Sequence, residues 1–500
     1  MQGAQAPRTP HTAQAKFPYA EGLASAMLYS QQDKVYVCFS QHHRSRTLLG
    51  GAWGSLEGIG AFVPITIRRF VVELIKESKV MGVYPLRHYR WPNGLQALLV
   101  QNPISPVAAL LVQYTVGSAW EEDNQRGLAH FFEHMMFRET DKLADGEFDR
   151  TVSECGGVGL NAYTSYDTTA YHVSVPADQL EKVVGLEADR MVNLRLTPEQ
   201  IEKERGAVLG EIHMYQDMPS EQHWHALMDE AFPHHPYRHP IIGYPEQVEG
   251  FQAQDFIRFY HDHYAPNRAV VVVAGGFDNQ TVLDILDRAF SGLKPGSPRP
   301  VIPPPEQPLA APVHKTITHG KITSETLFLA AHAPGITHAD TPALSFLAWL
   351  LAGGQSSPLH RRLVLETGLA THVSANLMDV EWTLASPSLF LIDVSLQQGK
   401  TADQAEAEVN SILEDLGNNG IAPEEYERAR NQLRLNHYSS LRSNMALARY
   451  LGGHYVACGD PLFGDQLHQA MVEVTPERLT QVLKTYWLNS PRVYLAQRPE

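Results

Sequence analysis

The sequence predicts an α+β protein built from two halves of similar pattern. Each half contains a strand-like run followed by two helix-like segments, which is typical of helices layered on a sheet. Between the halves lie residues 292–313, a segment in which eight prolines stand between positions 295 and 312. Such a segment is typical of an extended, semi-rigid connector. The repeated order of elements on both sides of it indicates two distant repeats.

In the first half, a tight turn is followed by strands and helices. Asn93-Gly94 is typical of a hairpin turn, because both residues tolerate a left-handed backbone. Thr197 is suited to cap a helix N-terminus, and Pro198 to occupy its first turn. The expected elements are strands over residues 95–100, 171–176 and 270–273, and helices over residues 177–192 and from position 197 onwards.

The second half repeats the order of a strand and two helices. A strand is expected over residues 389–396, a helix over residues 401–416, and another helix opening at residues 422–425. Residues 344–351 occupy the place of the most polar helix of the first half, yet they contain neither His nor Glu. We therefore expect this segment to be hydrophobic core.

Residues 127–137 carry the most informative motif, His-x-x-Glu-His at His130, Glu133 and His134. On a helix each residue advances by about 100°, so the two histidines lie about 40° apart on one face. Two imidazoles so placed can hold a zinc ion while the carboxylate holds a water beside it, as in the inverzincin signature. The alternative is an ordinary helix with solvent-facing polar residues. It fits less well, because the intervening residues are apolar and predict burial.

A catalytic zinc usually takes a third protein ligand from another element. The helix from Thr197 offers Glu204 and Glu211, which are seven residues apart and fall within about 20° of each other on one face. For an arbitrary helix, such glutamates more often form a solvated stripe. Apolar neighbours around Glu211 favour the edge of a buried region instead.

These residues and several short motifs resemble the M16 (pitrilysin, inverzincin) metallopeptidase family. The size of the chain is similar to that of the mitochondrial processing peptidase β subunit and its bacterial relatives. The resemblance runs from about Tyr84 to the C-terminus. The other matching motifs are Pro92-Asn93-Gly94-Leu95, Gly117-Ser118-Ala119, Gly156-Gly157, Asn161-Ala162-Tyr163-Thr164, His239-Pro240 with Gly243, and Tyr264-Ala265-Pro266-Asn267.

The resemblance implies two homologous α+β domains, each a mainly antiparallel sheet packed under helices. A zinc-binding peptidase domain is expected over residues 84–291, and a second domain without a metal site over residues 314–500, joined by the linker at 292–313. Residues 1–83 have no counterpart in the family pattern. We expect them to be an irregular leader that is either disordered or not translated, with Met81 as an alternative start. Within it, residues 67–80 have the pattern of an amphipathic helix.

Residue by residue, the resemblance assigns roles around one zinc ion per chain. His130, His134 and Glu211 are implied as zinc ligands, and Glu133 as the general base that takes a proton from water. Glu204 is implied to support the site from outside the ligand set. An edge strand that pairs with the peptide backbone of the substrate is implied for Asn161, Ala162, Tyr163 and Thr164.

One family feature is missing from this sequence. Family members or their partner subunits often carry an Arg and a Tyr, seven residues apart, in the second domain. Val364 and Thr371 stand at those places here. Neither residue can donate a charge-assisted or phenolic hydrogen bond to a peptide. One alternative is sequence drift, or an alignment slip that lets Arg361 or Arg362 serve instead. The other is that a homologous partner subunit supplies the pair.

Composition narrows the classes of partner. The formal net charge of −15 argues against nucleic acid and anionic membrane surfaces, which select basic patches. Three cysteines far apart predict no disulfide framework. No run of about 20 apolar residues predicts a membrane span. The cytoplasm is the expected compartment, with the periplasm or an organelle left open.

The leading functional prediction is a zinc-dependent endopeptidase that cleaves extended peptides, as the catalytic subunit of a heterodimer. An alternative within the same chemistry is a dedicated enzyme that processes one precursor peptide. A third reading is a non-catalytic core subunit of a larger complex. That reading is disfavoured because such subunits have usually lost ligands, whereas all four residues of the implied site are present.

Overall fold

The computed structural model describes residues 26–31, 34–39, 72–297, 306–378 and 388–500. The chain divides into two compact units, residues 1–71 and 72–500. In the first unit, β1 (Ala26–Gln31) pairs antiparallel with β2 (Lys34–Phe39). The second unit contains two sheets with their helices. Part of the proline-rich connector expected at 292–313 lies outside the described residues.

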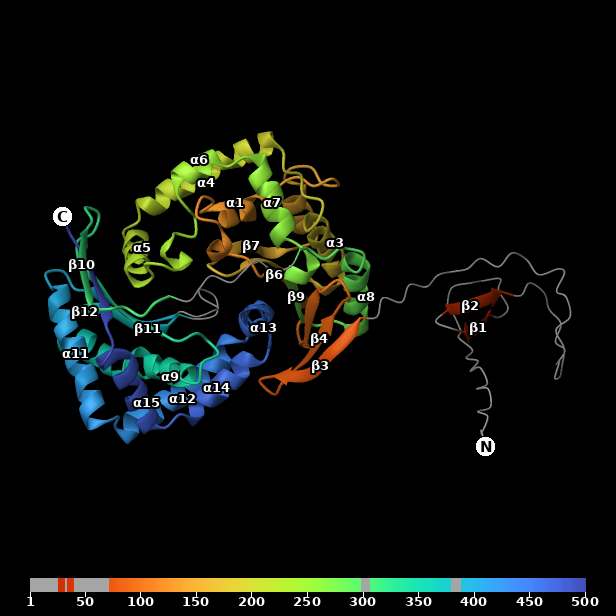
Figure 1. The fold of residues 1–500 in the computed structure, drawn as a ribbon. Coiled ribbons are helices and arrows are strands. Elements are labelled where there is room, and N and C mark those ends of the chain that lie inside the picture. The colour runs from red at the N-terminus through yellow and green to blue at the C-terminus, as the bar shows by residue number, and fades with distance from the viewer. Residues whose placement is uncertain (1–25, 32–33, 40–71, 298–305, 379–387) are drawn as a thin grey trace, which may run out of the picture. The chain divides into compact units, whose positions relative to one another are not determined.

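The first sheet has seven strands in the order β3-β4-β5-β9-β6-β8-β7 (Figure 1). Only β5 and β9 pair in parallel among these neighbours, and the other pairs are antiparallel. β7 is one edge of this sheet and β3 the other. The strands are β3 (Glu73–Val80), β4 (Tyr84–Arg90), β5 (Gln96–Gln101), β6 (Val107–Tyr114), β7 (Val158–Thr164), β8 (Thr169–Pro176) and β9 (Ala269–Gly275).

The second sheet has five strands in the order β10-β14-β11-β13-β12. Its single parallel pair is β10 with β14. The strands are β10 (Val313–Thr318), β11 (Thr326–Ala333), β12 (Ala370–Leu377), β13 (Ser388–Leu396) and β14 (Arg492–Arg498). The predicted α+β fold with two sheet-and-helix regions is confirmed, and each sheet is mainly antiparallel.

Helices follow the strands in both halves. In the first half they are α1 (Leu128–Met135), α2 (Glu147–Glu154), α3 (Leu180–Arg190), α4 (Pro198–Gln216), α5 (Pro219–Ala231), α6 (Pro245–Gly250), α7 (Ala253–His263) and α8 (Asn279–Phe290). In the second half they are α9 (Thr341–Ala352), α10 (Pro358–His360), α11 (Ala402–Asn419), α12 (Pro423–Ser440), α13 (Asn444–Cys458), α14 (Phe463–Glu473) and α15 (Pro476–Leu483). Thr197 caps α4 as predicted, accepting a hydrogen bond from the Gln200 backbone N–H.

Each half covers one sheet face of the other half with a helix. α13 packs on β5, β6 and β9 of the first sheet, where Leu447 and Leu451 join a buried cluster with Leu111 and Val272. Reciprocally, α5 packs on β11 and β14 of the second sheet, and its Leu227 belongs to a buried cluster with these strands. The two halves are therefore held together by hydrophobic contacts in both directions.

The segment expected as a helix over residues 67–80 is different in the structure. Residues 67–71 lie outside the described part, and residues 73–80 form the edge strand β3, paired with β4. This part of the prediction was wrong, because pairing with β4 outweighs the helical periodicity of a mostly exposed, charged segment. Charged side chains are typical of edge strands. The sheet therefore begins before residue 84, and a chain starting at Met81 would lack β3.

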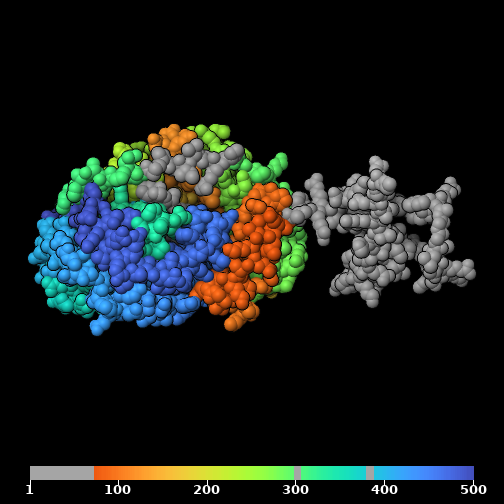
Figure 2. Space-filling model, turned by 60° about the horizontal axis from the view of Figure 1, so that its bottom comes forward, coloured from red at the N-terminus to blue at the C-terminus, as the bar shows by residue number. Residues whose placement is uncertain are grey.

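The hairpin between β3 and β4 touches the second half. The Met81 backbone N–H donates a hydrogen bond of 2.5 Å to Asp465 on α14. Figure 2 shows the orange surface of β3 and β4 directly beside the blue surface of the C-terminal helices. Within the described residues, no helix combines the length and apolar character that a bilayer crossing requires.

Candidate metal centre and substrate strand

The helix α1 is short and buried on most of its surface. Its N-cap Gly127 has φ of 97°, and a side chain there would meet the backbone oxygen of Ile242 at 2.5 Å. The apolar residues of α1 point into the core, and Phe131 and Phe132 are fully buried. These contacts leave one polar face, which α1 presents to α4.

That face brings together two imidazoles and a carboxylate. The candidate ligand atoms of His130, His134 and Glu211 all lie within 4.8 Å of one another. The Glu211 Oε2 is 3.8 Å from His130 Nε2 and 3.3 Å from His134 Nε2. The structure thus gathers the three residues implied as ligands, although 77 positions separate Glu211 from His134 in the sequence.

The chemistry of these donors fits zinc. Two imidazole nitrogens and one carboxylate oxygen form a common donor set for catalytic zinc, which keeps a fourth position open. Burial, aided by the nearby His134, lowers the pKa of His130 to about 4, so its imidazole is neutral and able to bind a cation at pH 7. A hydrogen bond with His134 holds the pKa of Glu211 below its ordinary value, which keeps that carboxylate charged.

Glu204 fixes the orientation of His134. The Nδ1 of His134 lies 2.9 Å from Glu204 Oε1, which leaves Nε2 directed at Glu211. Arg138 forms an ion pair with the other oxygen of Glu204, so a carboxylate that is only 4% exposed has partners on both sides. Burial lowers the pKa of His134, but hydrogen bonds with Glu204 and Glu211 outweigh burial and raise it to about 9, so at pH 7 this imidazole must release a proton when a cation binds. A buried carboxylate behind a ligand imidazole is the usual support of a metal site.

Glu133 lies on the same face and is held by the edge strand. The Thr164 hydroxyl donates a hydrogen bond of 2.6 Å to Glu133 Oε2. Burial raises the pKa of Glu133 above its ordinary value, whereas this hydrogen bond and the nearby His134 act against the rise. A carboxylate with a raised pKa beside a metal site is suited to accept and return a proton near neutral pH.

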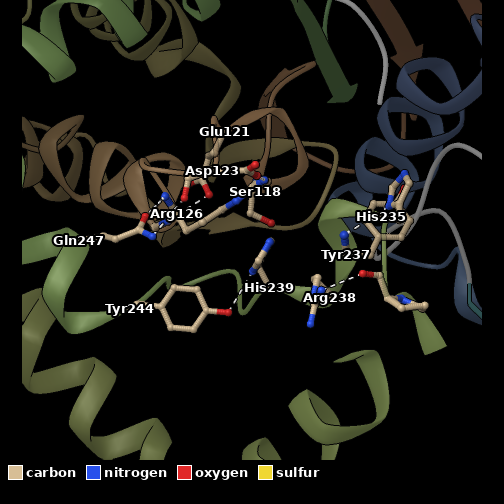
Figure 3. Close-up of polar contacts among 12 residues, drawn as sticks. Ser118, Glu121, Asp123, Arg126, His235, Tyr237, Arg238, His239, Tyr244 and Gln247 are labelled. Carbon is tan, nitrogen blue, oxygen red and sulfur yellow. Dashed lines mark hydrogen bonds and ion pairs between the residues drawn. The ribbon is translucent and has the colours of Figure 1, made fainter. Parts of the chain in front are cut away.

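The start of α1 is supported by a buried cluster that the sequence did not reveal. Glu121, only 6% exposed, accepts backbone hydrogen bonds of 3.0 Å from Gly127 and 2.7 Å from Ala129. Burial raises the pKa of Glu121 to about 8. Figure 3 shows Arg126 in the same cluster, where its guanidinium donates to Ser118 and Asp123. A carboxylate that caps a helix N-terminus fixes the first turn, so Glu121 positions the turn that carries His130.

The loop after α5 packs against the same turn. A side chain at Gly243, where φ is 78°, would meet the Arg126 backbone oxygen at 2.2 Å. The motif His239-Pro240 with Gly243 therefore corresponds to a close approach of two backbones. His239 is anchored by a 3.0 Å contact between its Nδ1 and the Tyr244 hydroxyl, as Figure 3 shows. The sequence pointed to this contact only through the family motif His239-Pro240 with Gly243, whose glycine permits the positive φ.

The strand predicted to pair with substrate forms the sheet edge. Asn161, Ala162, Tyr163 and Thr164 all belong to β7, which is bonded to β8 and ends the sheet order. Side chains alternate between the two faces. Ala162 packs against the core under α1, whereas Tyr163 packs against the cluster under α13. Among the described residues, β7 pairs with β8 on one side and with no strand on the other.

The positions of the absent Arg/Tyr pair lie in the second half. Val364 is part of a π-helical segment, Arg361–Glu366, and packs against the second core. Thr371 is exposed on β12, where its hydroxyl donates to the Ser395 carbonyl. Arg361 pairs with Glu425 and Arg362 with Glu408, so carboxylates of the same half hold both guanidinium groups.

Comparisons of sequence and of structure with known proteins both find peptidases. The family model described as insulinase (peptidase family M16) matches residues 96–244, and that described as the peptidase M16 inactive domain matches residues 250–433. The zinc protease PqqE of Helicobacter pylori is 30% identical over 374 residues, which are 73% of this chain and 82% of that protein. A probable mitochondrial-processing peptidase subunit beta of Schizosaccharomyces pombe is 25% identical over 433 residues, 84% of this chain and 91% of that protein. The crystal structure of a protease from Helicobacter pylori superimposes with a TM-score of 0.78 at 26% identity, covering 85% of this chain and 100% of that chain.

Proposed function

The chain belongs to peptidase family M16, and from that premise we propose that it is a zinc-dependent endopeptidase acting on extended peptides. The observation that carries the proposal is the convergence of His130, His134 and Glu211, with Glu133 beside them. We further propose one zinc ion per chain. A non-catalytic subunit would not need two imidazoles and two carboxylates grouped at one site.

In the proposed reaction, each side chain has a distinct task. His130, His134 and Glu211 would hold the ion, which when bound polarises the scissile carbonyl and acidifies water. Glu133 accepts a proton from the attacking water and returns it to the leaving amine. Thr164 orients the Glu133 carboxylate through its hydrogen bond. Glu204 keeps His134 in the tautomer that presents Nε2.

The substrate is proposed to bind as an added strand. The edge of β7 opposite β8 has no strand partner within the described part of the chain, so it offers backbone hydrogen bonds to an extended peptide, and Asn161 to Thr164 would lie along it. Because the last residue of that strand also contacts Glu133, a peptide on this edge would pass the candidate metal site. This geometry favours unfolded segments over compact proteins.

We also propose that the chain is the catalytic subunit of a heterodimer with a homologous M16 subunit. Support comes from Val364 and Thr371, which stand where the family often has a peptide-contacting Arg and Tyr. The ion pairs of Arg361 and Arg362 with carboxylates of their own half argue against a substitute there. The partner would supply the missing pair. A full rate of peptide cleavage by the isolated chain would contradict this part of the proposal.

The central test compares the parent chain with Glu133→Gln, using metal analysis and a peptide-digestion assay. We expect one zinc per chain in both proteins, and a loss of kcat of about 100-fold or more in the variant. Glu154→Gln, at an exposed position on α2, is the matched control and should cleave like the parent. Equal cleavage by parent and Glu133→Gln would refute the assigned base.

A further inference from the structure

The loop between α1 and α2, residues 138–145, joins the helix that carries His130 and His134 to the helix that carries Glu211. Three of its side chains contact the N-terminal half of α4, in the pairs Arg138 with Glu204, Glu139 with Gln200, and Asp145 with Lys203. Contacts of one loop with one helix fix how α1 and α4 stand relative to each other. The candidate metal centre depends on that relation, because its three ligand residues come from both helices.

Arg138 is the central residue of this loop. Its Nη2 pairs with Glu204 Oε2, and its Nη1 lies 3.3 Å from Asp145 Oδ1. The other oxygen of Asp145 lies 2.6 Å from Lys203 Nζ. Behind His134, acidic and basic side chains therefore alternate outwards from a buried Glu204 to Lys203, whose side chain is 65% exposed.

The inner pair of this row matters more than the outer pair. A buried carboxylate must be compensated, and Glu204 has a different partner on each oxygen, His134 Nδ1 at 2.9 Å and Arg138. A carboxylate held at one oxygen alone would be freer to rotate about its last bond and to turn away from the imidazole. The exposed pair of Asp145 and Lys203 is screened by solvent and contributes little.

We infer that Arg138 is a positioning residue of the metal centre, an inference that rests on the proposed zinc peptidase function. Acting through Glu204, it holds the His134 imidazole with Nε2 directed at Glu211, and it fixes α1 against α4. Arg138 binds neither the ion nor the peptide in this role. A group that supports a ligand from behind commonly changes metal affinity by about 10- to 100-fold when it is lost.

The test titrates zinc into the full-length chain against a competing chelator, with no peptide present. Arg138→Gln should bind zinc about tenfold more weakly than the parent. Arg138→Lys keeps a positive charge that can pair with Glu204 but loses the planar fork that also reaches Asp145, so its loss should be about threefold or less. Equal zinc affinity in the parent and Arg138→Gln would overturn the inference.

A double-mutant cycle tests whether Arg138 acts through Glu204. If it does, the double variant Arg138→Gln/Glu204→Gln should bind zinc about as weakly as Glu204→Gln alone, because the second change removes a partner of a group already lost. Losses that multiply in the double variant would mean that the two residues act independently. That result would overturn the positioning role.

Controls separate this effect from a change in fold or net charge. Arg258→Gln removes the same charge at an exposed position of α7, where Arg258 pairs with Asp255, and it should leave zinc affinity unchanged. Lys203→Gln, at the outer end of the row, should change it by about twofold or less. Circular dichroism of each metal-free variant should match that of the parent.

Because zinc affinity is measured without peptide, the inference and the proposed function can fail separately. Affinities in the expected order, together with no cleavage of any peptide by the parent, support Arg138 and refute the peptidase proposal alone. Unchanged zinc affinity in Arg138→Gln, together with peptide cleavage by the parent, overturns the inference and leaves the proposed function standing. A parent chain that binds no zinc would overturn both.

Discussion

The helices α1 and α9 occupy corresponding places in the two halves, yet one holds the candidate metal site and the other is core. α1 packs on α4, and α9 packs on α12. Counted from the proline that begins each long helix, Glu204 of α4 corresponds to Ala429 of α12. Both are buried. The same layout thus supports either a metal site or an apolar interface, according to the side chains between two helices.

The difference has an energetic consequence for each half. A buried carboxylate such as Glu204 must be paired, and it contacts His134 and Arg138. Ala429 has no polar side-chain atoms and needs no such partners. It lies in the same buried hydrophobic cluster as Leu350 and Leu351 of α9. The polar groups proposed to bind zinc in the first half therefore cost some stability, whereas the second half gains stability from apolar burial.

The strongest test of this contrast removes a ligand in the first half. In His134→Ala, we expect zinc to be lost and peptide cleavage to fall by at least about a thousandfold, because the ion loses one of three ligands. Metal analysis and the digestion assay measure both effects. His261→Ala, at an exposed position of α7, should retain zinc and activity. Retention of stoichiometric zinc by His134→Ala would rule out the ligand assignment.

A matching change in the second half should act on stability instead. Leu350→Ala in α9 removes a fully buried side chain, and we expect the free energy of unfolding to fall by about 2–5 kcal/mol. Zinc content at 20 °C should stay at the parent value. Denaturant unfolding of the variant is compared with Leu435→Ala, whose side chain is 66% exposed and should matter little. A loss of zinc without loss of stability would contradict the division between the halves.

The packing of α5 on the second sheet buries a histidine, which predicts that the free energy of unfolding depends on pH. His223 on α5 is buried against the second sheet, stacked on Phe328, with its Nε2 3.1 Å from the Leu495 carbonyl oxygen. Burial lowers its pKa from 6.5 to about 4. As the pH falls from 6.5 towards 4, His223 binds a proton in the unfolded chain but stays mostly neutral in the folded chain. Stability is therefore present above pH 6.5 and is lost below it, by up to about 3 kcal/mol.

Unfolding free energies of the parent and His223→Gln, measured between pH 4 and 7.5, test this expectation. Glutamine retains a donor and an acceptor but does not titrate. The variant should show a shallower loss of stability over this range. Identical pH dependence in both proteins would mean that His223 does not contribute to it.

The smallest expected effect concerns Glu204, the counterpart of Ala429. Glu204→Gln should weaken zinc binding or cleavage by about 10- to 100-fold, because the support of His134 loses its charge. Zinc titration against a competing chelator measures the change. Glu202→Gln lies on the same helix, where Glu202 pairs with Arg205, and it should leave zinc affinity unchanged. An unaltered zinc affinity in Glu204→Gln would remove this residue from the site.

Prediction from the sequence succeeded where the signal was local. The cap at Thr197, the helix over His130 to His134 and the strand that contains Val270 all depend on neighbours along the chain. It failed for residues 73–80, whose strand is decided by pairing with β4. The support of α1 by Glu121 left no recognisable pattern, because a buried carboxylate bonded to backbone N–H groups has no characteristic spacing.

The sequence by itself determined that two histidines and a glutamate share one helical face, since the helix repeat fixes the direction of each side chain. Only the tertiary structure decided that Glu211 meets them, that Thr164 holds Glu133, and that Arg449 of the second half stands over Tyr163 of the first. Contacts between distant residues depend on how helices and sheets pack. That packing is set by burying apolar surface throughout the chain, and no single motif encodes it.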